Sequence, residues 1–138
     1  MNDSRSRKQN SQTRYRPAHI FASLRTYSGP MCNFKYFYSG TDGFVSKCNG
    51  CGHFQVSFSG MVLTLTSHDF QVLCHVTDFK CNDLPGPLYD NVKSVFIPTP
   101  SPYIYFFLTP HETIDFRRML EKADTEQKTR SLLSLFDK

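Results

Sequence analysis

Residues 33–66 carry four short runs in which apolar and polar side chains alternate, and clusters of turn residues separate the runs. In the clearest run, Phe54, Val56 and Phe58 fall on one face while polar residues fall on the other. This period of two is typical of a half-buried strand. Ser59-Gly60 is typical of a two-residue hairpin turn. Short connections favour antiparallel pairing, so the pattern predicts a four-stranded antiparallel meander over residues 33–66.

Hairpin register determines which residues face one another at the ends of this meander. If Tyr38 pairs with Gly43, then Cys32 lies opposite Asn49. If the turn is one residue longer, Cys32 faces Gly50 instead. In both registers we expect the first strand to bring Cys32 to the connection between the second and third strands.

A helix is predicted after the meander. Ser67 is suited to the N-cap, and the carboxylate of Asp69 in the first turn interacts favourably with the helix dipole. The positions that share one helical face are mostly apolar, namely Phe70, Leu73, Cys74 and Thr77. Residues 82–87 are rich in Asn, Asp, Gly and Pro and predict a loop.

Two further strands are predicted at Val92–Ile97 and Tyr103–Leu108. The connection between them, residues 98–102, contains three prolines in five residues. Proline fixes the backbone and lacks the N–H that a sheet ladder needs. The two strands therefore predict a second β-hairpin with a stiff loop.

The C-terminal segment starts with a strong helix signal. Thr109 suits the N-cap, Pro110 suits the first helical position, and Glu112 lies three residues after the cap, as in a capping box. An apolar stripe then runs to Ala123, whereas residues 124–131 contain no apolar side chain. Two alternatives follow. One long helix extends past the core, or the helix breaks near Ala123 and a second short helix follows.

Together these elements predict an α+β fold: an antiparallel β-meander with a cysteine knuckle, one middle helix, a second β-hairpin and a long C-terminal helix. We expect residues 31–138 to form a single domain. The chain is 39% hydrophobic and 20% charged, which supplies a core and excludes a wholly disordered protein. The apolar runs are too short for a transmembrane helix, and no apolar segment follows the basic start as in a secretory signal. These features predict a cytoplasmic protein without a membrane partner.

Positive charge is concentrated in residues 1–30. This segment has six basic side chains and one acidic side chain, whereas the other 108 residues have ten basic and eleven acidic ones. It is polar and shows no sustained period, so we expect a basic, disordered N-terminal arm. Such an arm can bind nucleic acid. Because Met31 directly precedes the cysteine motif, the segment is also compatible with an upstream in-frame extension.

The motif Cys48-x2-Cys51-Gly52 points to a metal. Two cysteines at this spacing, followed by glycine, let a tight turn present both thiolates to one tetrahedral ion. Fifteen residues separate Cys32 from Cys48, so the chain supplies three of the four cysteines of a zinc ribbon, with Gly29 at the missing position. Zinc is the expected metal because thiolates dominate the ligand set.

The fourth ligand has several candidates. His53 is the nearest in sequence, so we predict a zinc site at Cys32, Cys48, Cys51 and His53. The alternatives are His68, Cys74, Cys81 or a water molecule, which catalytic zinc sites often keep. Cys74 is equally compatible with a buried small hydrophobe on the apolar helix face.

Other interpretations of the cysteines stay open. An odd count of five favours reduced thiols in a reducing compartment over a disulfide framework. Three nearby cysteines are also compatible with reduced, partly buried thiols without metal. An iron–sulfur cluster usually needs four cysteines. A redox couple of Cys48 and Cys51 lacks the surrounding βαβ pattern.

The segment from Gly43 to Phe58, which contains the knuckle, together with Leu63–Thr66 resembles a bacterial domain-of-unknown-function family of short uncharacterised proteins with a CxxC knuckle. The Ile97–Pro100 strand and the Leu-rich C-terminal helix are similar as well. The resemblance covers about residues 31–136. It implies no known activity.

Three functions remain. The first is a non-enzymatic binding or adaptor module with a structural zinc site, acting on an unknown protein partner or as a homo-oligomer through Leu132–Phe136. The second is a nucleic-acid-binding protein that uses residues 1–30 and aromatic platforms such as Tyr36, Tyr38, Tyr103 and Tyr105. The third is an enzyme, which the sequence does not favour. The sequence has no glycine-rich phosphate loop, no H-E-x-x-H motif and no G-x-S-x-G motif, and we identify no catalytic residue.

Overall fold

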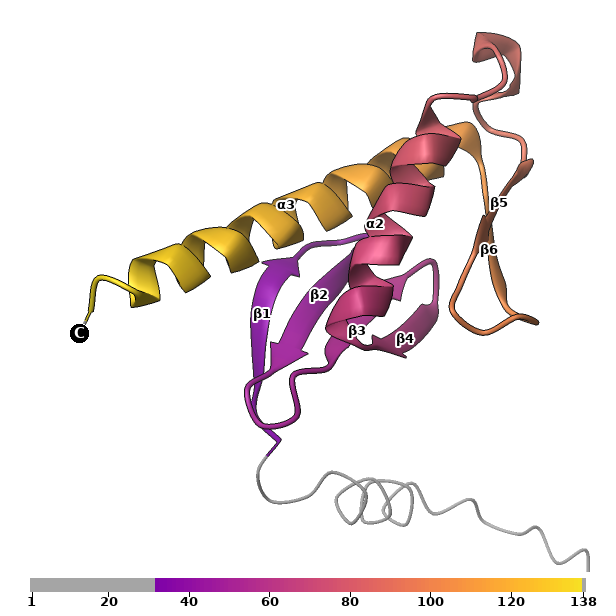
Figure 1. The fold of residues 1–138 in the computed structure, drawn as a ribbon. Coiled ribbons are helices and arrows are strands. Elements are labelled where there is room, and N and C mark those ends of the chain that lie inside the picture. The colour runs from indigo at the N-terminus through magenta and orange to yellow at the C-terminus, as the bar shows by residue number, and fades with distance from the viewer. Residues whose placement is uncertain (1–31, 138) are drawn as a thin grey trace, which may run out of the picture. The chain divides into compact units, whose positions relative to one another are not determined.

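The fold was analysed in a computed structural model that describes residues 32–137. The elements follow the order β1, β2, β3, β4, α2, β5, β6, α3, with a short 3-10 turn, Pro87–Tyr89, before β5 (Figure 1). Their bounds are Phe34–Ser39, Gly43–Cys48, Phe54–Phe58, Met61–Leu65, Ser67–Cys81, Val95–Pro98, Tyr105–Leu108 and Pro110–Ser134. The predicted α+β fold is confirmed. The arm predicted over residues 1–30 lies outside the described residues.

The meander is an antiparallel sheet of four strands in the order β1-β2-β3-β4. Phe54, Val56 and Phe58 of β3 are buried, as their alternation predicts. The β3–β4 turn places Ser59 and Gly60 at φ values of 51° and 77°. Positive φ at both central residues is the geometry of a type I′ hairpin, which matches the twist of the flanking strands.

The first hairpin has a register that neither simple turn predicts. Tyr38 pairs with Val45 rather than with Gly43, and Tyr36 pairs with Ser46, so an irregularity at Phe37 shifts the ladder by one residue. Such an extra residue is a β-bulge. Near the cysteines, before the irregularity, Phe34 pairs with Cys48. This part of the ladder has the register predicted for the longer turn, which puts Cys32 opposite Gly50.

Gly43 allows β2 to lie against β3. A Cβ atom at this position would lie 1.8 Å from the backbone oxygen of Ser57, which is well inside van der Waals contact. Only glycine fits there without moving one of the two strands. The glycine of the predicted turn therefore also serves the packing of the sheet.

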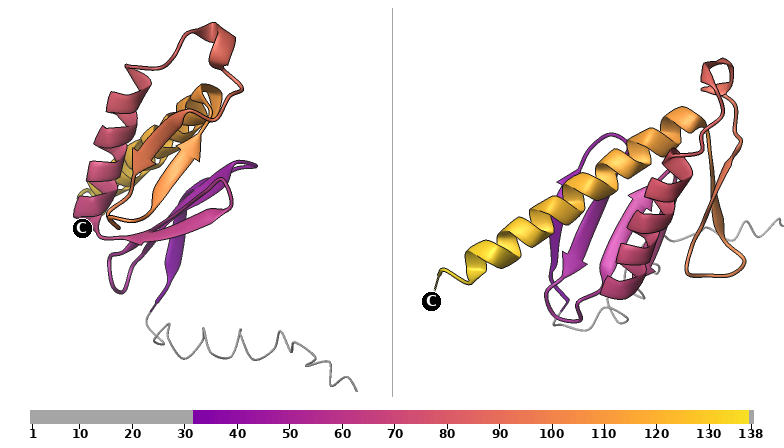
Figure 2. Two further views of the ribbon diagram at one scale, coloured as in Figure 1. Left: turned by 90° about the vertical axis from the view of Figure 1, so that its right-hand side faces the viewer. Right: turned by 45° about the horizontal axis from the view of Figure 1, so that its top comes forward.

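Helices α2 and α3 cover one face of the meander, as the two views in Figure 2 show. The N-cap of α2 is Thr66 and not Ser67: Thr66 is extended, and its Oγ1 accepts a hydrogen bond from the N–H of Asp69 at 3.1 Å. Ser67 already has helical geometry, so the cap lies one residue earlier than predicted. Phe70 of α2 stacks on Phe54 at 4.2 Å between ring centroids.

Helix α3 is one continuous helix through the polar segment, which decides between the two alternatives. The predicted capping box is present, because Thr109 Oγ1 accepts from the Glu112 N–H at 3.0 Å and Glu112 accepts from the Thr109 N–H at 2.8 Å. Ion pairs four residues apart, Lys128–Asp124 and Arg130–Glu126, support the segment that lacks apolar residues. Within the described residues, no helix is long and apolar enough to cross a membrane.

Strands β5 and β6 form a separate two-stranded sheet. Strand β5 starts at Val95 and not at Val92, because the chain before it still turns: the Val92 N–H donates to the Tyr89 carbonyl at 3.0 Å. Strand β6 starts at Tyr105 and not at Tyr103, because the Ile104 N–H donates to the Ser101 carbonyl at 3.3 Å in the preceding turn. The residues that face inward are Val95, Ile97, Phe106 and Leu108, and all four are buried. Phe116 of α3 contacts both Phe58 of β3, at 4.7 Å between centroids, and Phe106 of β6, at 4.8 Å. One aromatic side chain thus joins the hairpin to the meander.

Candidate metal centre

The connection between β2 and β3 is a tight turn that starts and ends with backbone hydrogen bonds. The Gly52 N–H donates to the Cys48 carbonyl at 2.9 Å, and the Cys48 N–H donates to the His53 carbonyl at 2.9 Å. Gly52 has a φ of 77°, which is the left-handed region that favours glycine. The glycine after Cys51 therefore lets the chain turn back into β3.

Three thiols meet at this turn. The Sγ atoms of Cys32, Cys48 and Cys51 all lie within 4.8 Å of one another. Around a tetrahedral zinc with Zn–S bonds of about 2.3 Å, neighbouring sulfur atoms would be about 3.8 Å apart. A small inward movement of the exposed cysteines would bring the three sulfurs onto one ion.

Pairing of β1 with β2 brings Cys32 to the turn. The ladder extends past Phe34 and Cys48, because the Asn49 N–H donates to the Asn33 carbonyl at 2.9 Å. The hairpin register had predicted this meeting. The structure brings together the three predicted cysteine ligands, one from the start of β1 and two from the turn.

Hydrogen bonds prepare Cys48 to act as a thiolate. The backbone N–H of Cys51 donates to Cys48 Sγ at 3.5 Å and is the main reason why the pKa of Cys48 falls to about 6. The pKa of Cys32 is raised, chiefly because its thiol hydrogen-bonds to Cys48, with the negative charges of Cys48 and Cys51 adding to the effect. A second anionic sulfur is thus disfavoured until a cation compensates for it.

Solvent can reach the cluster from one side. Cys48 is buried, whereas Cys32 and Cys51 are exposed. Two accessible thiols beside a buried thiolate are suited to capturing an ion from solution and holding it at the edge of the core.

His53 does not belong to this close group of three sulfurs. It lies directly before β3 and is partly buried, and only its backbone oxygen is tied to Cys48. The register of β3 and β4 places it opposite Thr66, and the exposed His68 follows Thr66 by two residues in the sequence. His53 as the fourth ligand stays a prediction.

Cys74 and Cys81 lie on α2, outside the group. Cys74 packs against the core, and burial raises its pKa to about 12, in agreement with its interpretation as a small hydrophobe. Cys81 Sγ donates to the Thr113 carbonyl at 3.6 Å, at the end of α2 that lies far from the β2–β3 turn in Figure 1. Both thiols have structural contacts of their own.

Three basic residues line an open cavity next to Cys48 and were not predicted as site residues: Lys35, Lys47 and Arg130. Two signals were present in the sequence. The register that pairs Phe34 with Cys48 also pairs Lys35 with Lys47. Gln127, Arg130, Ser131 and Ser134 have the spacing of one helical face.

Comparisons of the chain with protein-family models, with curated proteins and with solved structures found no match. The resemblance to a bacterial family of unknown function therefore remains an expectation from sequence.

Proposed function

We propose that this protein is a non-enzymatic binding or adaptor module of the cytoplasm, held together at one end by a structural zinc ion. The observation that carries the proposal is the cluster of Cys32, Cys48 and Cys51 Sγ atoms within 4.8 Å of one another. These thiols come from chain segments that the zinc ion would tie together: the start of β1 and the β2–β3 turn.

The chemistry of the donors supports zinc. A buried sulfur that accepts a backbone N–H bond is the arrangement in which thiolates serve structural zinc. Metal binding at such a site contributes directly to the free energy of folding. His53 would complete a closed four-ligand site, which is the geometry of structural rather than catalytic zinc.

Elemental analysis of protein purified without an affinity tag tests the proposal. We expect about one zinc per chain, and we expect the thiols of Cys32, Cys48 and Cys51 to react with a thiol reagent only after a chelator is added. A zinc content near zero, with these thiols freely titratable in the native protein, would contradict it. The partner, an unknown protein or a second copy, stays a prediction.

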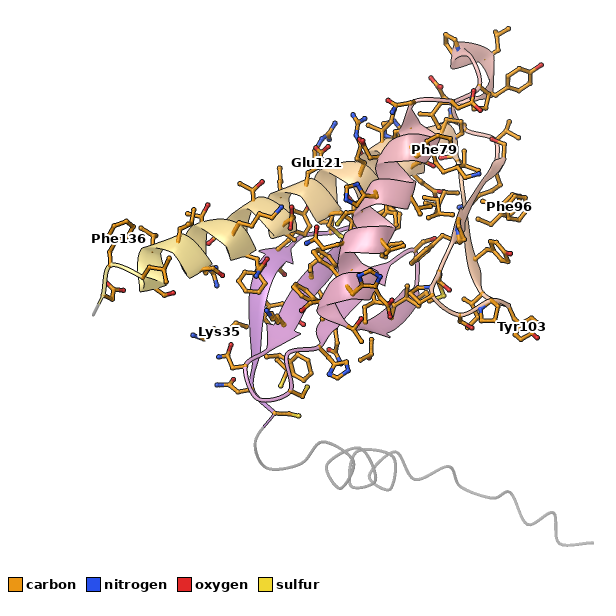
Figure 3. The ribbon with its side chains drawn as sticks, viewed as in Figure 1. Lys35, Phe79, Phe96, Tyr103, Glu121 and Phe136 are labelled. Carbon is orange, nitrogen blue, oxygen red and sulfur yellow. The ribbon has the colours of Figure 1, made fainter. Side chains whose placement is uncertain are left out.

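A second candidate function is nucleic-acid binding, and one feature favours it. The outer face of the β5–β6 hairpin is aromatic: Phe96 stacks on Phe107 at 4.5 Å between centroids and meets Tyr105 edge-on at 6.3 Å. All three are exposed, and Tyr103 is 91% exposed; Figure 3 shows Phe96 and Tyr103 pointing away from the helices. Exposed aromatic rings can stack with bases.

Of the other predicted platforms, Tyr36 is exposed, whereas Tyr38 packs against the core. Affinity for single-stranded DNA, measured with and without residues 1–30 and with Phe96→Ser in the full chain, separates the two functions. The nucleic-acid function predicts salt-dependent binding that both changes weaken. The adaptor function predicts no measurable binding to the full chain.

A further inference from the structure

An open cavity of about 370 Å³ lies between the sheet and the last turns of α3. Strands β1 and β2 and the cysteine turn form one side, and α3 forms the other. Its lining includes three basic side chains, Lys35, Lys47 and Arg130, and no acidic one. Figure 3 shows Lys35 on β1, below the C-terminal half of α3 in that view.

The two lysines are direct neighbours across the sheet, since Lys35 and Lys47 are Cα partners in the β1–β2 ladder. Like charges directly opposite each other destabilise a strand pair. Among the described residues, neither ammonium group has a carboxylate within 4.0 Å. Lys47 Nζ lies 5.1 Å from the centroid of the Phe54 ring, which keeps this charge on the inner side of the sheet.

Arg130 is fixed in place from two directions. Its guanidinium carbon lies 4.9 Å from the centroid of Phe37, and its Nε donates to Glu126 Oε1 at 2.6 Å. No described residue accepts a hydrogen bond from its two Nη groups. The guanidinium is therefore oriented while two of its donor groups stay available.

The face of α3 toward the sheet changes character along the helix. Phe116, Leu120 and Ala123 are buried apolar residues, whereas the same face continues with Gln127, Arg130, Ser131 and Ser134. The helix thus extends over the sheet with polar side chains where a core would need apolar ones. This arrangement leaves a polar cavity between the helix and the sheet.

We propose that this cavity binds a small molecule through a phosphate group. Arginine and lysine are the side chains that bind phosphate through charge-assisted hydrogen bonds, and hydroxyl and amide groups add further donors. The volume lies at the lower end of the range for small-molecule sites and suits a ligand no larger than a mononucleotide. A bound phosphate would also relieve the repulsion between Lys35 and Lys47.

The nearby negative charges do not cancel the three cations. Glu126 lies outside the lining of the cavity and is already paired with Arg130. The inference is independent of the zinc proposal. Zinc content measured on the same samples separates the two, because phosphate binding without zinc would contradict only the proposed function.

Isothermal titration of the full chain with AMP, with adenosine and with inorganic phosphate, at low salt, tests the proposal. We expect AMP to bind with a stoichiometry of one and inorganic phosphate to compete with it. Adenosine should bind at least about 10-fold more weakly, which corresponds to the loss of one charged hydrogen bond. Equal affinity for AMP and adenosine would overturn the proposal.

Variants locate the binding site. Lys35→Gln and Arg130→Gln should each weaken AMP binding by about 10-fold or more, whereas Lys80→Gln, with the same charge change at the end of α2, should not.

Without ligand, Lys35→Gln should raise the melting temperature because the repulsion with Lys47 is removed. Addition of AMP should then raise the melting temperature of this variant less than that of the native chain. AMP binding that survives both cavity variants would overturn the proposal, since the phosphate would then bind elsewhere, for instance to residues 1–30. A single-stranded oligonucleotide that binds 100-fold more tightly than AMP through Lys35 and Arg130 would overturn the small-molecule assignment in favour of nucleic acid.

Discussion

The backbone N–H of Cys51 donates a hydrogen bond to the Sγ of Cys48 across 3.5 Å, inside the turn that joins β2 to β3. This bond stabilises negative charge on the one thiol of the cluster that is buried. Cys48 also pairs with Phe34 in the ladder of β2 with β1. Metal binding and sheet formation therefore share this residue.

Cys48→Ser is expected to abolish zinc binding and to destabilise the meander by several kcal/mol, because the free energy of zinc binding is then lost from folding. Zinc content by elemental analysis and urea unfolding followed by circular dichroism measure the two effects. Cys81→Ser is the matched control, because Cys81 lies outside the cluster and a serine hydroxyl can still donate to the Thr113 carbonyl. Equal zinc content in the two variants would refute the assignment of Cys48.

His53→Ala tests the fourth ligand. If the imidazole completes the site, its loss should weaken zinc affinity by at least about 10–100-fold, because the loss of an outer-shell partner alone costs this much. Competition with a chromophoric chelator measures this affinity. His68→Ala provides the comparison, since His68 is an exposed histidine at the start of α2. Unchanged affinity in His53→Ala together with a loss in His68→Ala would transfer the role to His68.

Much of the fold could be predicted because several local signals agreed. Three signals each specify one local geometry, and the structure has all three: the alternation in Phe54–Phe58, the Ser59-Gly60 turn and the Thr109–Glu112 capping box. The meeting of Cys32 with Cys48 and Cys51 also followed from register alone. These features depend on residues close in sequence or directly paired in a hairpin.

Features that depend on tertiary contacts could not be predicted in the same way. The bulge at Phe37 shifts the register of the first hairpin. The Phe37 side chain packs against the core and contacts the guanidinium of Arg130. Arg130 lies more than ninety positions away in the sequence, so no local pattern reports this contact. The cavity depends on where α3 crosses the sheet, and no local pattern determines that crossing. Continuity of α3 through residues 124–131 is a different case, because it rests on local ion pairs four residues apart, which the apolar pattern does not report.

Ser46→Ala is expected to stabilise the protein. Ser46 is 1% exposed, and its hydroxyl has no hydrogen-bond partner among the described residues. A buried hydroxyl without a partner costs about 1–3 kcal/mol, so its removal should raise the free energy of unfolding by about 1 kcal/mol. Urea unfolding measures the change, with Ser57→Ala on the neighbouring strand as control. A loss of stability in Ser46→Ala would show that the hydroxyl has a partner, such as a bound water molecule.

Glu112→Gln tests the capping box through its pH dependence. Burial opposes ionisation of Glu112, but hydrogen bonds from Lys93 and from the Thr109 N–H outweigh it and hold the pKa of this carboxyl below its ordinary value of 4.5. Since the folded pKa is the lower one, the stabilisation is fully present above pH 4.5 and is lost as the pH falls through the folded pKa. At pH 7 the variant should be about 1 kcal/mol less stable than the native chain, which is the usual cost of a weakened N-cap.

The difference between the native chain and Glu112→Gln should shrink as the pH is lowered from 5 to 3, because protonation removes the same charge from the native carboxyl that the substitution removes. Glu121→Gln is the control: it makes the same charge change in the exposed middle of α3, where no backbone N–H depends on the carboxylate. Thermal unfolding at a series of pH values measures all three proteins. A gap between the native chain and Glu112→Gln that stays constant down to pH 3 would mean that the stabilisation does not come from the ionised carboxylate.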